Sequence, residues 1–250
     1  MDDPRIAAAD HAPAGSATVS ALALLLLGDG RFPAGGHAHS AGAESAVADG
    51  RIHDVASLEA FVLGRLWTAG LVDAALAAST ARRIGRCVGD DDVRAELRVL
   101  DGEADARVPT EPLRAASRRL GRQLVRVSSR CWPDSVLVSL IDELPDGTHL
   151  PIALGTVGVA AAIDPVDVAR LATHHTITTA AQAALRLLGL DPYDVAASTV
   201  RLGEVAAAVV DEAMAWSTVD DLAELPARTG PVVEIAAVEH RRWDHRLFAT

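Results

Sequence analysis

Residues 193–216, YDVAASTVRLGEVAAAVVDEAMAW, carry the clearest periodic pattern in the chain. Val195, Leu202 and Val209 return to one side of a helix, and charged residues such as Glu212 occupy much of the other side. Apolar residues at this spacing form the buried stripe of an amphipathic α-helix. The stretch therefore predicts one long helix.

The same reasoning predicts helices on both sides of this stretch. They cover residues 16–27, 41–48, 54–86, 92–105, 112–129, 133–144, 150–163 and 164–190. No sustained alternation of apolar and polar residues predicts a sheet, although residues 136–141 form a short ambiguous apolar run. We predict an all-α fold.

The domain organisation follows from where Pro, Gly and charged residues gather. Residues 16–225 contain no convincing linker and predict a single-domain multi-helix bundle. Residues 1–15, rich in Asp, Ala, Pro and Gly, predict a flexible N-terminal tail. Residues 226–250 contain Pro226, Gly230 and Pro231 and end in several arginines, which predicts a tail that orders on a partner.

The composition excludes several classes of function. Hydrophobic residues make up 50% of the 250 residues but aromatic ones only 3%, so Ala, Leu and Val must fill the core. The net charge of −11 argues against nucleic-acid binding, which needs a basic surface. The chain contains no lysine, so neither a Schiff-base lysine nor a Walker A lysine exists.

Compartment is predicted from cysteine usage and apolar runs. Cys87 and Cys131 are too few for a disulfide framework and are expected to be small buried side chains in a reducing compartment. The N-terminus lacks a basic signal-peptide region, and the apolar run at residues 21–27 is too short to cross a membrane. We expect a cytoplasmic protein that does not bind a membrane.

His37 and His39 form the candidate metal-binding pair. An H-x-H pair supplies metal ligands when it lies at the end of a strand, but on a loop the spacing guarantees nothing, so ordinary loop histidines are favoured. His174 and His175 are adjacent in a helix and point about 100° apart, so they are poorly placed to share a metal. Ser40 is best interpreted as the N-cap of the helix at residues 41–48.

Arginines recur every four residues at positions 114, 118, 122, 126 and 130, with Arg119 beside them. Each step of four drifts about 40° around a helix, so the row spirals. Two interpretations stay open: a solvated helix face paired with neighbouring acids, or a docking patch for an acidic partner.

Residues 28–44, GDGRFPAGGHAHSAGAE, resemble the signature of the urease accessory protein UreF family. The matching positions are Asp29, Pro33, Gly35, His39, Ser40, Gly42 and Glu44, with Gly36 in the same loop. Two positions depart from the family pattern, because His37 stands where the family has Phe and Ala43 where it has Leu.

Later blocks resemble the same family in the same order. These are Leu100-Asp101, a central helix motif with Arg114, Ser117, Gly121 and Arg122, then His149-Leu150-Pro151, Ala183–Leu187, and a C-terminal ending with Glu239, His240, Arg246, Leu247 and Phe248.

The resemblance implies a homodimeric, all-α scaffold without enzymatic activity. Such a protein bridges UreD and the GTPase UreG and assists GTP-dependent nickel insertion into apo-urease. It implies no tightly bound cofactor, only a transient passage of nickel. We expect the loop motif to support UreG docking and the C-terminal ending to contact UreD. The alternatives are a metal-dependent hydrolase that uses His37 and His39, and a generic helical adaptor.

Overall fold

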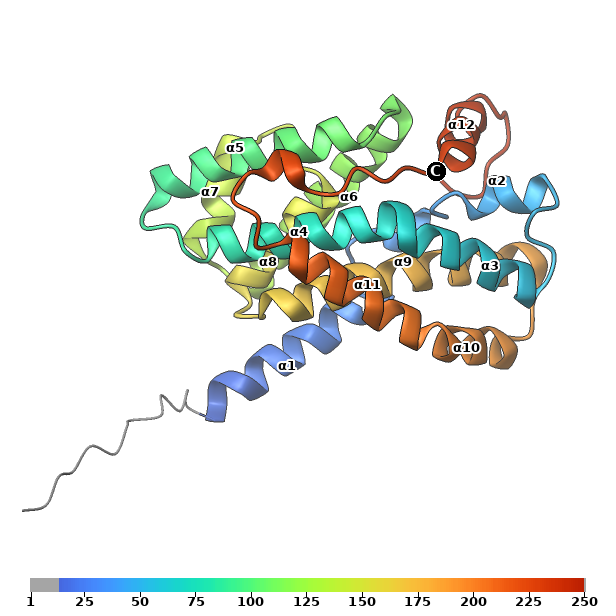
Figure 1. Ribbon diagram of the computed structural model, residues 1–250, viewed down its shortest axis with the longest axis horizontal. Helices are drawn as coiled ribbons and strands as arrows, with labels where there is room; N and C mark the ends of the chain where they lie inside the picture. Colours follow the sequence, from blue (N-terminus) through green and yellow to red (C-terminus); the bar gives the residue numbers. More distant parts are fainter. Residues whose placement is uncertain (1–13, 250) are drawn as a thin grey trace, which may run out of the picture.

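The computed structural model describes residues 14–249, and these residues form helices joined by turns, with no β-strand among them (Figure 1). The elements are α1 (Ala14–Gly28), η1 (Gly36–Ala38), α2 (Ala43–Ala48), α3 (Val55–Arg65), η2 (Leu66–Gly70), α4 (Leu71–Ile84), α5 (Asp90–Arg107), α6 (Glu111–Cys131), α7 (Ser135–Glu143), α8 (Leu150–Ala160), α9 (Pro165–Leu188), α10 (Pro192–Arg201), α11 (Gly203–Trp216), η3 (Leu222–Glu224) and α12 (Pro231–His240). The predicted all-α fold is confirmed.

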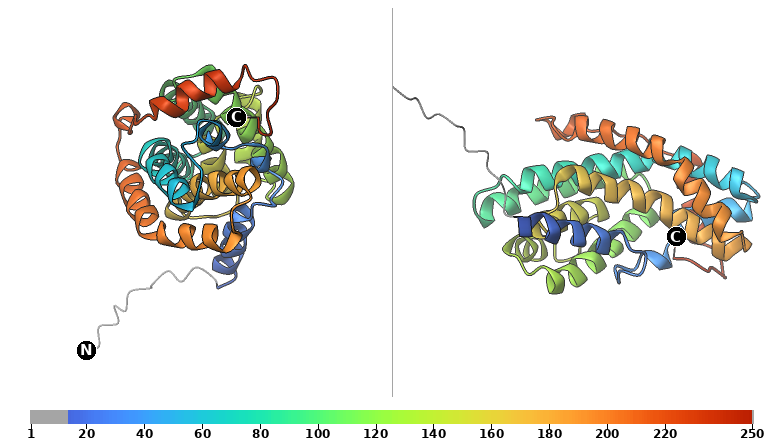
Figure 2. Two further views of the ribbon diagram at one scale, coloured as in Figure 1. Left: turned by 90° about the vertical axis from the view of Figure 1, so that its right-hand side faces the viewer. Right: turned by 90° about the horizontal axis from the view of Figure 1, so that it is seen from below.

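Helix α4 lies at the centre of the bundle, packed against α8, α9 and α11, and α6 packs on the other side of α8 (Figures 1 and 2). Small residues let these helices approach closely. A Cβ on Gly155 of α8 would stand 2.5 Å from the Cβ of Thr80 in α4, so the two helices meet there without room for a further atom. The Ala-rich core predicted from composition forms as expected, with Ala74 and Ala77 fully buried.

Aspartate side chains start several of the helices. Asp54 accepts a hydrogen bond from the Ser57 backbone N–H at 2.8 Å, and Asp191 accepts one from Tyr193 at 2.8 Å. Each satisfies one of the backbone donors that a helix N-terminus leaves free. Asp164 occupies the N-cap of α9 ahead of Pro165, although its side chain makes no capping bond.

The helix predicted over residues 54–86 contains a π-helical turn. In η2, Thr68 has φ −112° and ψ −109°, and its hydroxyl donates to the carbonyl of Gly64 at 2.9 Å. The combined helix Val55–Ile84 is long and apolar enough to cross a membrane, but half of its most apolar window is buried inside the protein. A core helix of a globular bundle has this property.

The single helix predicted over residues 193–216 is wrong in one respect, because the chain bends at Leu202 and Gly203. Helix α10 ends at Arg201 and α11 begins at Gly203. Gly weakens a helix interior, and the bend lets α10 pack on α3 and α9 while α11 packs on α4 and α9. The apolar side chains of the two shorter helices are buried against different neighbours, and this favours the bend over one continuous helix.

Ser40 is not the N-cap of α2, and the helix begins two residues later than predicted. Ala41 and Gly42 both have left-handed backbones, with φ of 52° and 87°, so neither can belong to the first turn. Gly42 is the N-cap, and Ser40 is fully buried. Similarly, Cys131 is exposed and Cys87 half-buried, so the expectation that both are buried is wrong.

The C-terminal segment is folded on the chain's own body. Helix α12 lies against α2 and α6, and residues 241–249 return across the loop that precedes α2 (Figure 1). A segment that orders only on a partner was expected here; whether it also contacts a partner stays a prediction. The expected N-terminal tail lies outside the described residues except for Ala14 and Gly15, which open α1.

Candidate partner-binding site

The loop before α2 lies closely against α6 and α12 because two of its residues have no side chain. Gly35 has a φ of 81°, and a Cβ there would stand 1.6 Å from the amide oxygen of Gln123 in α6. Gly42 has a φ of 87°, and its Cβ would stand 2.7 Å from Val233 of α12. The left-handed backbone favours glycine at both positions, and at Gly42 the close approach to Val233 favours it further. Packing therefore explains two of the motif positions.

Glu44, in the first turn of α2, binds three donors from the C-terminal segment. Its carboxylate accepts from His240 Nε2 at 2.7 Å, from the Leu247 N–H at 2.7 Å and from the Phe248 N–H at 3.1 Å. The side chains of Glu44 and His240 are 9% and 3% exposed, so these bonds are shielded from water. We call these four residues the C-terminal clasp. It joins the loop motif to the C-terminal motif.

Phe248 anchors the clasp in the core. Its side chain is 4% exposed, and the Arg186 guanidinium of α9 lies 5.6 Å from its ring centroid. Arg186 also donates to the carbonyl of His37 at 2.9 Å, and the N–H of Ala249 donates to the carbonyl of Ala38 at 2.8 Å. The loop, α9 and the chain end are thus held as one unit.

His37 and His39 lie in different environments. His37 is exposed, whereas His39 is 6% exposed. Burial, together with the positive charge of Arg119 and the neighbouring His37, lowers the pKa of His39 from 6.5 to about 4. The His39 ring is therefore neutral at neutral pH and serves as part of the packed loop.

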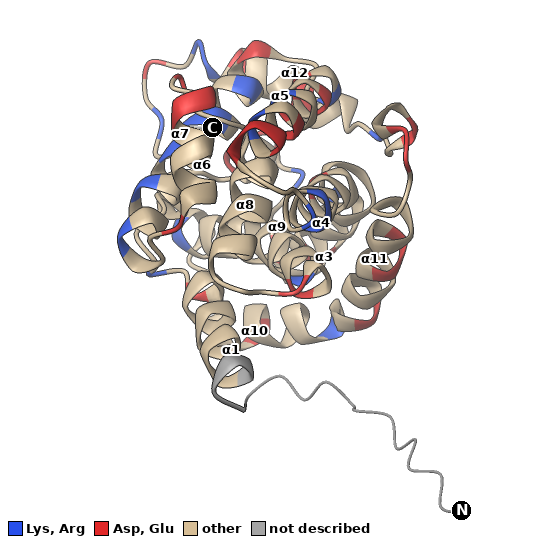
Figure 3. Ribbon diagram, turned by 90° about the vertical axis from the view of Figure 1, so that its left-hand side faces the viewer, with Lys and Arg blue, Asp and Glu red and all other residues tan. Residues whose placement is uncertain are grey.

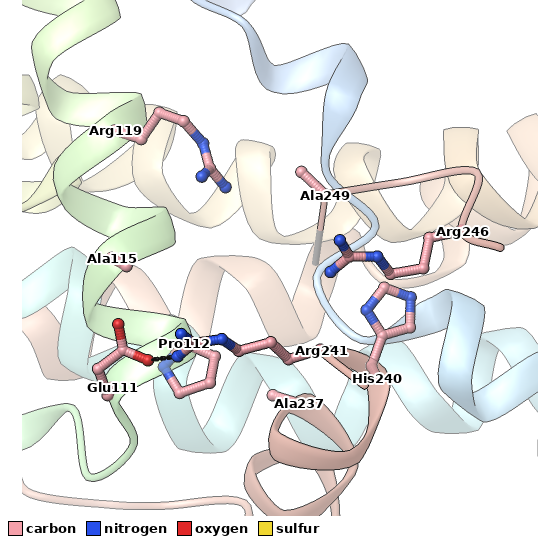
Figure 4. A pocket seen from close by; sticks show the side chains of 9 residues that line it. All are labelled: Glu111, Pro112, Ala115, Arg119, Ala237, His240, Arg241, Arg246 and Ala249. Carbon is pink, nitrogen blue, oxygen red and sulfur yellow. Dashed lines mark hydrogen bonds and ion pairs between the residues drawn. The ribbon is translucent and has the colours of Figure 1, made fainter. Parts of the chain in front are cut away.

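A cleft of about 430 Å³ opens between α6 and the C-terminal segment (Figure 4). Arg119 of α6 and Arg246 point into it from opposite sides, and Arg241, directly after α12, forms an ion pair with Glu111 at its lower edge. The buried His240 of the clasp forms part of its wall. The cleft thus places guanidinium groups beside the clasp, where they suit a carboxylate of another protein.

The end of α1 is held by two histidines of α9. His174 Nε2 donates to the carbonyl of Gly28 at 3.1 Å, and His175 Nε2 donates to the carbonyl of Leu27 at 2.9 Å. The last carbonyls of a helix lack partners within the helix, so these two side chains cap α1. The adjacent histidines thus have a structural role that their spacing alone did not reveal.

The central helix motif forms a second network, where α5, α6 and α8 meet. Asp101 accepts from the Thr148 hydroxyl at 2.7 Å and from the His149 N–H at 3.0 Å, and it pairs with Arg118 at 2.9 Å. Arg118 also pairs with Asp105, which accepts from His149 Nε2 at 3.0 Å. Burial lowers the pKa of His149. The network holds the start of α8 in place.

Two further motif residues serve the same junction. The Ser117 hydroxyl accepts from the Leu150 N–H at 3.0 Å, which satisfies a free donor at the start of α8. A Cβ on Gly121 would stand 2.2 Å from the carbonyl oxygen of Thr148, so α6 and the turn before α8 are in direct backbone contact. The block at residues 114–122 therefore has a structural role in this chain.

The structure places the predicted site residues at different depths. Exposed are Asp29, Pro33, Gly36, Arg122, Glu239, Arg246 and Leu247; half-buried are Gly35, Gly42, Arg114 and Ser117; buried are His39, Ser40, Glu44, His240 and Phe248. It brings the loop and the C-terminal ending together, whereas the central helix motif faces α5 and α8. Their contacts with partners stay predictions.

Sequence reasoning missed the positions that join these segments. Arg186 lies in the block Ala183–Leu187 and Gln123 directly follows the central helix motif, but only their contacts with the loop show what they do. Asp101 was matched to a family block but not expected to bond three groups. A buried carboxylate needs several hydrogen-bond donors, so a prediction that Asp101 is buried would also have predicted these bonds.

The structure offers no obvious metal centre in the part of the chain that it describes. Among residues 14–249, no group of three or more His, Cys, Asp or Glu side chains is arranged to hold a metal ion. His37 and His39 therefore have no third ligand beside them within this range.

Comparison with known proteins connects these motifs to one family. The UreF family model matches residues 52–203. The urease accessory protein UreF of Mycolicibacterium vanbaalenii is 39% identical over 234 residues, which span 93% of this chain and 100% of that protein. UreF of Mycobacterium marinum is 37% identical over 233 residues, covering 93% and 100%, and UreF of Mycobacterium tuberculosis H37Rv is 37% identical over 231 residues, covering 92% and 99%.

Proposed function

The chain belongs to the UreF family of urease accessory proteins, and from this premise we propose that it is a scaffold that bridges UreD and the GTPase UreG and assists GTP-dependent nickel insertion into apo-urease. In this proposal the chain catalyses no reaction, acts in the cytoplasm and handles nickel only as transient cargo. The observation that carries the proposal is the C-terminal clasp, because it combines two separated family motifs into one surface.

The C-terminal ending supports the assignment of this surface to UreD. Leu247 is 64% exposed although its neighbour Phe248 is 4% exposed. The buried ring anchors the segment and the clasp fixes its backbone, so Leu247 is presented outward and Arg246 is held at the cleft. Arginine is enriched among the residues that anchor interfaces, and a fixed backbone lowers the entropic cost of binding. The neighbouring loop is proposed to support UreG docking.

Helix α1 supports the proposal of a homodimer. It lies at the edge of the bundle against α9 (Figures 1 and 2), and Val19, Leu22, Leu25 and Leu26 on it are 60%, 58%, 72% and 44% exposed. Exposed apolar side chains gathered on one helix mark a surface that another molecule covers. A second copy of the chain would bury α1 against α1 in a symmetric contact.

The two alternatives gain no support. A metal-dependent hydrolase would need His39, which is buried in the packed loop, and a third ligand that residues 14–249 do not supply. A helical adaptor unrelated to urease is disfavoured by the family membership.

The UreD assignment is tested by the double variant Arg246→Ala/Leu247→Ser in co-purification with UreD. Both side chains are exposed, so folding is retained, and we expect at least about a tenfold loss of affinity because anchor residues dominate interface energies. Deleting residues 246–250, a cruder test expected to abolish the complex, would also remove the buried Phe248 and two donors to Glu44.

Arg86→Ala/Val88→Ser is the matched control, because it removes an exposed arginine and an aliphatic side chain that is 86% exposed in the turn after α4. It should bind UreD as the unmodified chain does. Equal binding by both double variants would reject the assignment of the C-terminal ending to UreD.

A further inference from the structure

The arginine row of α6 divides into two halves with different environments. Arg114 donates to the carbonyl of Val108 at 2.7 Å, and Arg118 is engaged by Asp101 and Asp105. Arg126 and Arg130, about two and three turns beyond Arg118, are exposed and form no hydrogen bond or ion pair with residues 14–249. The first half is structural, and the second half is available to bind.

Arg126 and Arg130 line a groove of about 580 Å³ between α6 and α7. Arg119 and Arg122 lie along the same groove, and Val125, Leu140, Ile141 and Leu144 contribute its apolar surface. Within residues 14–249 no Asp or Glu lines it. We call it the α6–α7 groove. It is a basic, partly apolar channel.

The two acids at the end of α7 are paired away from this groove. The nearest carboxylates of α7 are turned toward α5, where Asp142 pairs with Arg94 at 3.1 Å and Glu143 pairs with Arg98 at 2.6 Å. Figure 3 shows basic residues gathered on the side of α6, although the chain as a whole carries a net charge of −11. The positive charge of the groove therefore suits acidic groups of another molecule.

We propose that the α6–α7 groove is the docking site for an acidic amphipathic helix of a partner protein. This inference rests on the proposed scaffold function and identifies the chemistry of one partner surface. Arg126 and Arg130 are four residues apart, about 6 Å along the helix axis, which matches two carboxylates at i and i+4 of a helix laid alongside. The apolar face of that helix would cover Ile141, which is 47% exposed.

Nucleic acid is the less suitable occupant. A phosphate backbone could pair with the four guanidinium groups of the groove. It would leave the apolar surface around Ile141 and Leu144 uncovered, and the net negative charge of the protein would repel it.

The test uses the full-length chain and a fluorescein-labelled helical peptide of about 18 residues, with Leu at i, i+3, i+4 and i+7 and Glu on both flanks. We expect binding by fluorescence anisotropy that weakens as salt rises, since rim charges are screened. Arg126→Glu/Arg130→Glu should weaken it at least about tenfold. Ile141→Ser should weaken it also at high salt.

Matched controls separate the groove from net charge and from general hydrophobicity. Arg86→Glu/Arg170→Glu changes the net charge equally at exposed arginines outside the groove. Val138→Ser removes a side chain of the same helix that is 56% exposed but does not line the groove. Both should bind the peptide within about twofold of the unmodified chain.

The inference is overturned if groove and control variants bind the peptide equally, if a peptide with Lys in place of Glu binds as well, or if a single-stranded oligonucleotide competes with the same dependence on Arg126 and Arg130. Co-purification with UreD and UreG is read separately. If Arg126→Glu/Arg130→Glu assembles normally with both proteins, the proposed docking in the groove is rejected and the proposed scaffold function is unaffected. If the unmodified chain does not assemble with UreD and UreG, the proposed scaffold function is rejected, regardless of whether the peptide binds.

Discussion

At the scale of single residues, the decisive groups are buried polar side chains with partners far away in the sequence. Glu44 and His240 lie in α2 and at the end of α12, yet they share a 2.7 Å hydrogen bond shielded from water. A buried carboxylate without donors is costly, so the loop and the C-terminal ending stabilise each other. His39, in the same loop, is instead kept uncharged.

Stability is expected to depend on pH through His39. Because its folded pKa is about 4 and its ordinary value is 6.5, the unfolded chain takes up a proton in this range that the folded chain does not. The sign is therefore a loss of stability as the pH falls from 6.5 toward 4, amounting to at most about 2 kcal/mol at pH 5.

Urea unfolding at pH 7.5 and pH 5 measures this loss, and His39→Gln, which stays neutral, should show a smaller difference between the two pH values. His245→Gln removes an exposed histidine and should behave as the unmodified chain does. An unchanged pH difference in His39→Gln would contradict the assignment.

At the scale of helices and turns, close backbone contacts position the elements. Gly155 lets α8 approach α4, and Gly121 lets α6 touch the turn before α8. Asp101 and Ser117 accept from the backbone N–H groups of His149 and Leu150 at the start of α8, and Arg118 donates to the carbonyl of Gly147 in that turn. Helix periodicity alone does not distinguish such contact glycines from glycines that face water.

The pair Gly121→Ala and Gly102→Ala tests this difference. In Gly121→Ala the new methyl group meets the Thr148 carbonyl at 2.2 Å, and we expect a loss of roughly 1–3 kcal/mol in unfolding free energy. Gly102, inside α5, has no atom within 4 Å of its ideal Cβ position, so Gly102→Ala should stabilise by about 0.5–1 kcal/mol. Thermal and urea unfolding measure both; equal effects would show that the Thr148 contact is not limiting.

At the scale of the whole molecule, a central bundle carries several proposed contact surfaces, and Arg119 of α6 borders both the cleft and the α6–α7 groove. The clasp and its cleft lie beside α12, the α6–α7 groove lies on the basic side, and α1 projects at the edge (Figures 1, 3 and 4). His174 and His175 hold the end of α1, so its apolar stripe is fixed relative to the bundle. Several exposed surfaces on one bundle suit a protein that binds several others.

The α1 surface predicts the oligomeric state. Leu22→Arg/Leu25→Arg places two charges in the proposed symmetric contact, where each would be buried opposite its own copy, so we expect the dimer to dissociate into monomers. Light scattering coupled to size exclusion measures the mass. Val88→Arg, at another highly exposed aliphatic position, is the control and should leave the dimer intact. A monomeric unmodified chain, or a dimer that survives the double substitution, would reject the α1 interface.

The amino-acid sequence by itself determined the all-α class and most helices, because helix formation depends on short-range periodicity, caps and the preference of Ala and Leu for helices. The ordered motif blocks also predicted the family that the comparisons show. Asp54 as an N-cap was predictable for the same local reason.

Only the tertiary structure decided which of these residues meet. The helix over residues 193–216 bends at Gly203, and α2 starts at Ala43. Glu44 binds the C-terminal ending, and the arginine row is divided into a structural half and an exposed half. The physical reason is that burial and hydrogen-bond satisfaction depend on neighbours about 200 residues away along the chain, as for Glu44 and Leu247, whereas a sequence pattern records only neighbours within a few turns.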